Sequence, residues 1–282
     1  MTELVAVDFE AEKAAELFTK SLHETGFGVL KNHPIQKQLV ETIYQEWEEW
    51  FKGDENDKEA YLYNKETQDG FFPSRVSETA KGHKHKDIKE YYHVYPNGRC
   101  PESLEKHIRA YYKEAGLLAQ TLLSWVEAYS PPDIAAAYSS PLPEMIKESH
   151  KTLLRILHYP PMTGDEEPGA IRAAAHGDIN LLTVLPAANE PGLQVQRKDG
   201  SWMDAPSDFG LIIVNIGDML QEASQGYYPS TIHRVINPSG KASDKSRISL
   251  PLFLHPRPDV VLSERHTADT YLEERLRELG VK

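Results

Sequence analysis

The chain has 282 residues, 40% of them hydrophobic and 26% charged, as expected for a globular protein large enough to bury a sizeable core. Its formal net charge of −12 argues against a nucleic-acid-binding face, because a phosphate backbone would be repelled overall, although a local basic pocket for a small anion remains compatible. The single cysteine, Cys100, excludes a disulfide framework and a cysteine-based zinc or iron–sulfur site, and we expect neither a signal peptide nor a membrane span, hence a cytoplasmic protein.

The first 130 residues are predicted to be mixed and largely helical. Apolar residues at three- and four-residue steps indicate helices over Glu10–His23 and Gln36–Phe51, with a short buried strand over Gly26–Leu30 between them. The polar stretch Lys52–Lys89 is typical of a surface loop or of a lid over a site. The clearest helical pattern covers Glu102–Tyr129, where two prolines end it.

From about Lys151 the pattern changes to short apolar runs separated by Gly, Pro, Asn and Asp, which predicts the strands of a β-sandwich or barrel. These runs are TLLRILHY, NLLTVLP, GLQVQ, LIIVNIG, STIHRVI and RISLPLFLH. A charged helix is predicted over Thr267–Leu279. We therefore expect one unit over 1–282, mainly β with flanking helices, in which 1–130 is the largely helical part, 151–260 the β core with the site, and 261–282 the C-terminal helix.

Two potential metal ligands, His176 and Asp178, are two positions apart, so on extended backbone their side chains point the same way. This spacing alone is weak evidence, because the chain repeats it at His85 and Asp87. The second copy lies in a charged segment without an apolar strand beside it, whereas His176 precedes a predicted buried strand. A third ligand, His233, lies in another predicted strand. Two histidines and one carboxylate suit iron(II), manganese or zinc, and they match the facial triad of non-haem iron oxygenases.

An anion-binding pair is predicted at Arg247 and Ser249, which share one face of a later strand. A guanidinium aimed into an apolar barrel needs an anionic partner, since burying it unpaired is costly. The alternative is an arginine paired with an internal carboxylate. The same spacing occurs at Arg75 and Ser77, so the spacing alone is weak evidence for an anion site. The stronger evidence is the order of the motifs along the chain, which is the His-x-Asp pair, then His233, then the Arg-x-Ser pair.

These motifs together resemble the 2-oxoglutarate/iron(II)-dependent oxygenases, in particular the branch that contains isopenicillin N synthase and the plant flavonoid and gibberellin oxygenases. The resemblance covers nearly the whole chain. The segments that carry it are GFGVLKNHPI, DGFFPSRVSETAKGHKHKDIKEYYHVYP, LRILHYPPM, HGDINLLTVLP, the stretch from GLQVQ to STIHRVINP, and RISLPLFLHP. The resemblance implies that the His85 and Asp87 pair belongs to the structural framework of the family and does not bind the metal.

The resemblance implies a double-stranded β-helix (jelly roll) that holds iron through His176, Asp178 and His233. It also implies that Arg247 and Ser249 bind the distal carboxylate of 2-oxoglutarate, joined by Tyr159. The implied reaction couples oxidative decarboxylation of 2-oxoglutarate by O2 to oxidation, most simply hydroxylation, of a C–H bond in a small molecule, with ascorbate as a candidate reductant. One departure is Leu157, which stands where plant members carry an asparagine near the metal.

Several neighbouring residues have an ordinary structural interpretation. His158 is expected in the core or at the surface, Trp202 in packing and Asp218 in a turn, where it could also support a ligand histidine. Regular alternation places Phe253 on the face of Arg247 and Ser249, so it is a candidate for the pocket wall. A further set of aromatic residues could line a substrate entrance, but packing is their default role: Tyr91, Tyr92 and Phe71.

Three alternatives to the 2-oxoglutarate reaction stay open. The first is an iron oxygenase or oxidase that does not use 2-oxoglutarate, as isopenicillin N synthase and the aminocyclopropane oxidases do. The second is a non-catalytic metal-binding jelly-roll protein, and the third is a zinc hydrolase, which leaves Arg247 unexplained. We expect a small-molecule substrate, no nucleic-acid or membrane partner, and a monomer, with a dimer as the alternative.

Overall fold

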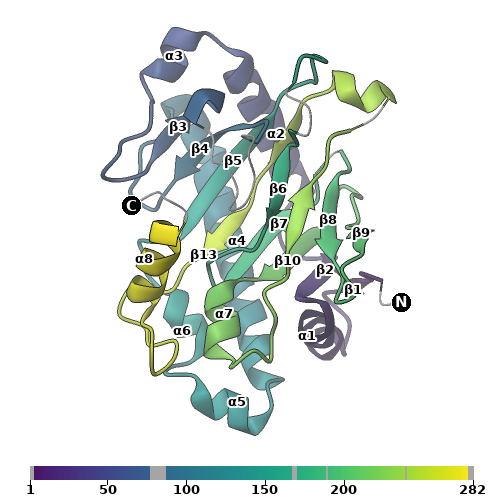
Figure 1. Ribbon diagram of the computed structural model, residues 1–282, viewed down its shortest axis with the longest axis vertical. Coiled ribbons are helices and arrows are strands. Elements are labelled where there is room, and N and C mark those ends of the chain that lie inside the picture. The colour runs from purple at the N-terminus through teal and green to yellow at the C-terminus, as the bar shows by residue number, and fades with distance from the viewer. Residues whose placement is uncertain (1–2, 77–86, 167–169, 189, 239, 279–282) are drawn as a thin grey trace.

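The computed structural model describes residues 3–76, 87–166, 170–188, 190–238 and 240–278. Two β-sheets face each other, and helices cover the outer face of the larger one (Figure 1). The larger sheet has nine strands in the order β1-β2-β10-β7-β13-β5-β4-β3, with β12 also paired to β5. The smaller sheet has four strands in the order β6-β11-β8-β9.

The strands of the larger sheet are β1 (Ala6–Asp8), β2 (Phe27–Lys31), β3 (Gly70–Phe72), β4 (Glu90–Val94), β5 (Leu153–Tyr159), β7 (Leu182–Pro186), β10 (Ile212–Ile216), β12 (Arg247–Ser249) and β13 (Leu252–Leu254). Those of the smaller sheet are β6 (Ala173–His176), β8 (Leu193–Gln196), β9 (Trp202–Asp204) and β11 (His233–Val235). The helices are α1 (Ala14–Thr25), α2 (Lys37–Lys52), α3 (Glu55–Glu59), α4 (Glu102–Ala128), α5 (Pro132–Ala137), α6 (Leu142–Ile146), α7 (Asp218–Ala223) and α8 (Ala268–Glu278), with 3-10 turns at Ser74–Val76 and Gly240–Asp244. The expected β core with flanking helices is confirmed.

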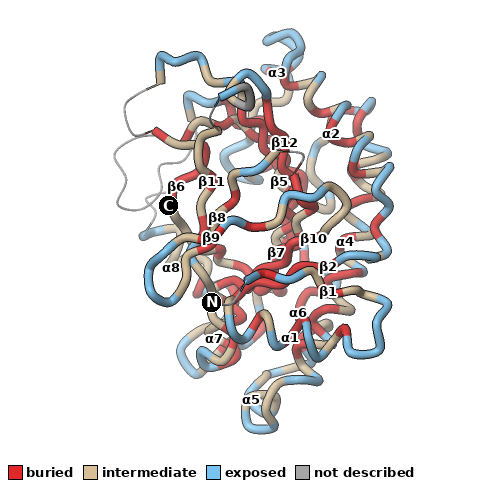
Figure 2. Tube along the Cα trace, turned by 90° about the vertical axis from the view of Figure 1, so that its right-hand side faces the viewer, coloured by how far each residue is buried: buried red, intermediate tan, exposed pale blue. Residues whose placement is uncertain are grey.

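Two apolar cores follow from the alternation of side chains along the strands. On β5, Leu154 and Ile156 belong to the cluster that packs against the helices, whereas Leu157 and Tyr159 belong to the cluster between the two sheets. Buried positions run along the central strands of both sheets (Figure 2). The inner cluster therefore forms the interior of a β-barrel, which is where inward-facing polar side chains can meet.

Strands β12 and β13 keep one register against β5. Arg247 lies opposite Tyr159, Ser249 opposite Leu157, and Phe253 opposite Leu153. Uninterrupted alternation puts Arg247, Ser249 and Phe253 on one face of the sheet, as expected. Since Tyr159 and Leu157 belong to the inner cluster, this face looks into the barrel.

The N-terminal part contributes more than helices, because four strands of the larger sheet come from it. Strand β2 pairs parallel with β1 and antiparallel with β10, with Phe27 opposite Asn215. Strand β4 pairs with β5. The expected strand at Gly26–Leu30 corresponds to β2, while β1, β3 and β4 were not predicted.

The polar stretch Lys52–Lys89 is not simply a surface loop or lid. It contains helix α3 and strand β3, and it buries several charged side chains in ion pairs or hydrogen bonds. Lys58 donates to the Phe51 carbonyl, and Asp69 accepts from the backbone N–H of Arg99. Residues 77–86, with His85 and Ser77, lie outside the described residues.

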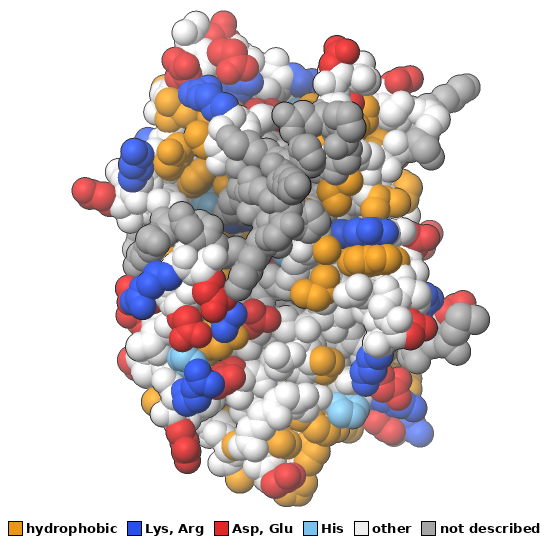
Figure 3. Space-filling model, viewed as in Figure 1, with side chains coloured by type: hydrophobic (Ala, Val, Ile, Leu, Met, Phe, Trp, Pro, Cys, Tyr) orange, Lys and Arg blue, Asp and Glu red, His pale blue; other side chains and the backbone are white. Residues whose placement is uncertain are grey.

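The described helices are too short or too polar to cross a membrane. On the face of the molecule seen in Figure 3, lysine and arginine side chains of the described residues are interspersed with acidic ones.

Candidate metal centre

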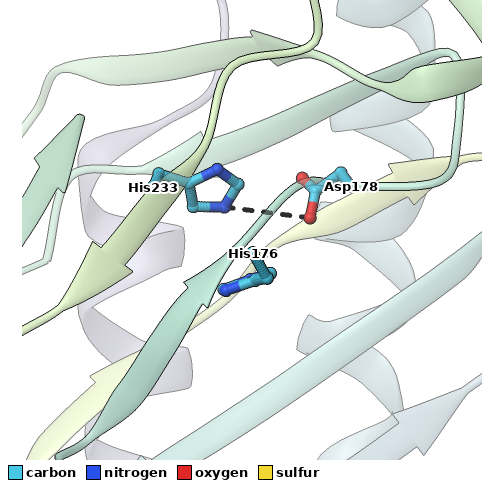
Figure 4. A group of neighbouring side chains, drawn as sticks. All are labelled: His176, Asp178 and His233. Atoms are coloured by element: carbon cyan, nitrogen blue, oxygen red, sulfur yellow. Dashed lines mark ion pairs between the residues drawn. The ribbon is translucent and has the colours of Figure 1, made fainter. Parts of the chain in front are cut away.

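Three potential ligands meet in the barrel. His176 ends β6, Asp178 follows it, and His233 begins β11 (Figure 4). Antiparallel pairing of β6 and β11 places His233 directly opposite His176. One ligand atom from each of the three residues lies within 4.8 Å of the others, and His233 Nε2 is 3.8 Å from Asp178 Oδ1. The structure thus brings together the three residues that the sequence pattern singled out.

Hydrogen bonds to the backbone orient both imidazole rings. Nδ1 of His176 is 2.7 Å from the Ala174 carbonyl oxygen, and Nδ1 of His233 is 3.1 Å from that of Thr231. A carbonyl can only accept, so each Nδ1 carries the proton and each Nε2 keeps its lone pair. This is the tautomer that a metal ion requires of a histidine ligated through Nε2.

The carboxylate of Asp178 is fixed through one oxygen only. Its Oδ2 accepts from the Thr183 hydroxyl at 2.6 Å and from the Asn215 amide at 2.8 Å. The Asn180 amide in turn donates to Thr183 Oγ1 at 2.9 Å. The other oxygen, Oδ1, faces His233. One oxygen is thereby held by the scaffold and the other is presented to the two histidines.

The backbone around Asp178 is tied to helix α7. The N–H of Asp218, in the first turn of that helix, donates to the Asp178 carbonyl at 2.7 Å. Asp218 is therefore a helix-start residue and not a turn residue, and it supports the carboxylate ligand through its backbone. Gly217 permits this contact, because a Cβ there would lie 2.1 Å from the Asn180 carbonyl oxygen.

A second group of polar side chains lies farther along the inner face. Arg247 is 3% exposed, its Nε donates to the Glu190 carbonyl at 3.2 Å, and its guanidinium lies 5.3 Å from the Tyr159 ring centre. The Glu190 carboxylate is paired with Lys245 instead. Among the described residues no carboxylate pairs with Arg247, and its Nη1 has no hydrogen-bond partner. Ser249 is buried on the same strand face. The buried Arg247 guanidinium therefore lacks the anionic partner that its burial requires among the described residues.

The competing aspartate, Asp87, has a structural role. Its Oδ1 accepts the backbone N–H of Ala174 at 3.0 Å, and its Oδ2 pairs with Lys89 at 2.7 Å. Both side chains are buried. Asp87 thus anchors the strand that carries His176, which agrees with its interpretation as scaffold.

The other singled-out residues fall on both sides of the sheet. His158 is buried on the helix side, where it pairs with Glu90 at 2.8 Å. Trp202 packs under Arg234, whose guanidinium is 4.0 Å from its ring centre. Tyr91 belongs to the inner cluster, together with Leu157. The remaining two belong to the helix-side core, which agrees with the packing role expected for them by default and not with a place at a substrate entrance: Tyr92 and Phe71.

The charge state of the site favours a metal near neutral pH. Burial, followed by the nearby His233, lowers the pKa of His176 to about 4. Burial alone would raise the pKa of Asp178, but the two histidines and the hydrogen bonds from Asn215 and Thr183 outweigh it and lower that pKa. A neutral imidazole beside an ionised carboxylate is the state that binds a divalent cation.

The metal-free protein is expected to lose stability as the pH falls from about 6.5 to about 4. Burial also lowers the pKa of His255 to about 4. Between pH 6.5 and pH 4 the unfolded chain therefore binds a proton at His176 and at His255, whereas in the folded chain both stay neutral. Each histidine should remove up to about 3 kcal/mol of unfolding free energy over this range. Urea denaturation of the chelator-treated protein between pH 7.5 and 4.5 measures the loss. His255→Gln should reduce it by about half, and an unchanged slope would contradict the assignment.

Comparison with known proteins agrees with this geometry. The family sequence model of the 2OG-Fe(II) oxygenase superfamily matches residues 150–256. A second family model, which is described as the N-terminal region of non-haem dioxygenases in morphine synthesis, matches residues 4–113. A crystal structure of an oxygenase from Shewanella oneidensis is 66% identical, with a TM-score of 0.90 and 100% of both chains covered. A 2OG-Fe(II) oxygenase family protein from Caulobacter crescentus is 26% identical, with a TM-score of 0.81 and coverage of 99% of this chain and 100% of that one.

Among curated proteins, 2-oxoglutarate-dependent dioxygenase 11 of Oryza sativa subsp. japonica is 29% identical over 248 residues. The match covers 84% of this chain and 65% of the rice protein, which is less than two thirds of that protein's length.

A β-helix barrel with a two-histidine, one-carboxylate cluster inside it is typical of the non-haem iron oxygenases. The chain belongs to the 2OG-Fe(II) oxygenase superfamily, whose fold is the double-stranded β-helix and whose members use Fe(II), 2-oxoglutarate and O2. The predicted family and jelly-roll fold are therefore confirmed.

Proposed function

We propose that the protein is an iron(II)- and 2-oxoglutarate-dependent dioxygenase that oxidises, most simply by hydroxylation, a C–H bond of a small molecule. In this proposal His176, Asp178 and His233 hold the metal, and Arg247, Ser249 and Tyr159 bind the distal carboxylate of 2-oxoglutarate. The observation that carries it is the combination of one three-ligand cluster and one buried, anion-deficient arginine inside the same barrel.

The donor set fits a divalent iron ion. Two neutral imidazole nitrogens and one carboxylate oxygen leave coordination positions free for a chelating keto acid and for dioxygen. Bound iron would supply the redox chemistry, with 2-oxoglutarate as the two-electron reductant of O2. A structural zinc site, by contrast, closes its coordination shell with a fourth protein ligand, and the described residues near the cluster provide none.

The protein's own residues position reactants and exclude water. The backbone carbonyls of Ala174 and Thr231 hold the imidazole protons on Nδ1 throughout, so these rings orient the site without exchanging protons. The guanidinium of Arg247 fixes the far end of the cosubstrate, and the apolar ring of Phe27, 5.5 Å from that of His233, covers one side of the cluster. Phe253 faces the interior from the strand beside Thr183, and we assign it to the wall of the substrate pocket.

Turnover of 2-oxoglutarate tests the proposal directly. Purified protein loaded anaerobically with Fe(II) should release succinate and CO2 from 2-oxoglutarate once O2 is admitted, slowly at first and faster when a suitable small molecule is added. A screen of small metabolites for such stimulation would identify the substrate class. Bound iron with no succinate under any condition would favour the oxidase or the non-catalytic alternative, and activity that survives without O2 would favour a hydrolase.

We also propose a monomer in the cytoplasm. The free thiol of Cys100 is compatible with a reducing compartment. Size-exclusion chromatography with light scattering would distinguish a monomer from a dimer.

A further inference from the structure

A second arginine shares the anion-deficient end of the barrel with Arg247. Arg172, which directly precedes β6, is 1% exposed and is one of the largest fully buried side chains of the protein. Its guanidinium lies 5.8 Å from the centre of the Tyr159 ring, the same ring that Arg247 approaches at 5.3 Å. The start of β6 in one sheet and β12 in the other therefore bring two cations to one tyrosine inside the barrel.

Among the described residues, none forms an ion pair with either cation. Arg172 donates through Nη2 to the Lys245 carbonyl at 3.1 Å, and its Nε has no hydrogen-bond partner among the described residues. The same holds for Nη1 of Arg247. In the described part of the chain no carboxylate lies within ion-pair distance of either guanidinium, and the carboxylate of Glu190 is paired with Lys245.

Two like charges in a buried place destabilise each other. Burial, and then the charge of Arg247, lower the pKa of Arg172. Such an arrangement costs folding free energy unless an anion is bound between the two groups. A carboxylate suits this place because its two oxygens offer about four acceptor positions. Arg247, Ser249 and Tyr159 offer donors for these positions, and Arg172 supplies a further donor from the opposite sheet.

We propose that Arg172 is a second binding residue for the distal carboxylate of the keto-acid cosubstrate, and that the two arginines together select a dicarboxylic keto acid over one without the distal carboxylate. This inference rests on the proposed function. It goes beyond it by assigning a residue that the Arg-x-Ser motif does not contain, and by attributing cosubstrate selectivity to a pair of cations.

The test measures binding rather than turnover. The full-length protein is loaded with Mn(II), which supports no oxidation, and titrated calorimetrically with 2-oxoglutarate and with 2-oxopentanoate. The latter has the same five-carbon chain and metal-chelating end but no distal carboxylate. The variants are Arg172→Gln, which removes the charge, and Arg172→Lys, which keeps it. Arg277→Gln, on the exposed side of α8, is the control for a change of one unit in net charge.

Arg172→Gln should weaken 2-oxoglutarate binding by about 10- to 100-fold, while binding of Mn(II) and of 2-oxopentanoate stays within about twofold of the unmodified protein. Arg172→Lys should give a smaller but selective loss, because an ammonium group cannot reproduce the fork of a guanidinium. Arg277→Gln should change nothing. If Arg172→Gln does not fold, the selective loss in Arg172→Lys decides.

Three results would overturn the inference. Unchanged 2-oxoglutarate affinity in both variants would show that Arg172 does not touch the cosubstrate. An equal loss for both keto acids would show a merely structural role. If the unmodified Mn(II) protein binds 2-oxopentanoate as tightly as 2-oxoglutarate, the two arginines do not select for the distal carboxylate. If it binds neither keto acid, the proposed function itself fails, and that outcome is distinguishable from the other three.

Discussion

Asp178→Ala is expected to abolish tight iron binding, with a loss of affinity greater than about 100-fold. The substitution removes the anionic ligand and leaves two neutral imidazoles, so little charge remains to offset the cost of dehydrating the ion. Anaerobic competition with a coloured Fe(II) chelator measures the affinity, and the electron paramagnetic resonance of Mn(II) gives an independent reading.

Thr183→Val is the graded control for this experiment. It removes one of the two hydrogen bonds to Oδ2 and leaves the carboxylate in place. Loss of such a supporting contact typically costs about 10- to 100-fold in metal affinity. The order of affinities should therefore be unmodified protein, Thr183→Val, Asp178→Ala. If the Asp178→Ala variant binds iron as tightly as the unmodified protein, the Asp178 carboxylate is not a metal ligand.

Arg247→Met should separate cosubstrate binding from metal binding. Methionine fills much of the same volume, so the barrel stays packed while the buried charge is lost. Truncating one partner of a buried charge pair typically costs about 2–5 kcal/mol, so the affinity for 2-oxoglutarate should fall by at least about 30-fold. Mn(II) binding should stay within about twofold, because Arg247 lies away from the three ligands.

Ser249→Ala provides the comparison on the same strand face. It removes a neutral donor only, for which a loss of about tenfold is expected. Titration of the anaerobic Fe(II) protein with 2-oxoglutarate, followed through the charge-transfer absorbance of the complex, measures both variants. Normal 2-oxoglutarate affinity in Arg247→Met would refute the assignment of the anion site.

The sequence predicted correctly which candidate residues share a face where they follow each other along one strand. Alternation placed Arg247, Ser249 and Phe253 on a common face, and the observed register is continuous. The position of His176 beside a buried strand separated it from the copy at His85. In both cases the informative distances along the chain are short, so local geometry decides the outcome.

Contacts between strands that are far apart in the chain could not be read from the sequence. Asn215 and Thr183 reach the same carboxylate oxygen because β10 and β7 pair in a particular register. Arg172 meets Tyr159 across the barrel. A single sequence does not show which strands pair or in which register. A side chain that hydrogen-bonds to a metal ligand also has no fixed spacing from that ligand along the chain.

Short strands were the main failure in predicting the fold. Strand β6 reads Ala-Ala-Ala-His, a composition that favours a helix, and it is a strand because it pairs with β11 and is anchored by Asp87. Strands β1 and β3 have three residues each, too few to show a period. Tertiary pairing overrides local preference in all three.

The place of β2 in the larger sheet has a consequence for how the protein assembles. Phe27 and Asn215 are neighbours in the sheet although 215 − 27 = 188 positions separate them along the chain. During synthesis β2 can pair with β1, but its other edge must wait until β10 has left the ribosome, so that edge stays unpaired through most of translation. Such long-range pairing makes folding slow and leaves the nascent N-terminal strands open to aggregation. Production of the protein should therefore depend on temperature and chaperone supply more than its final packing suggests.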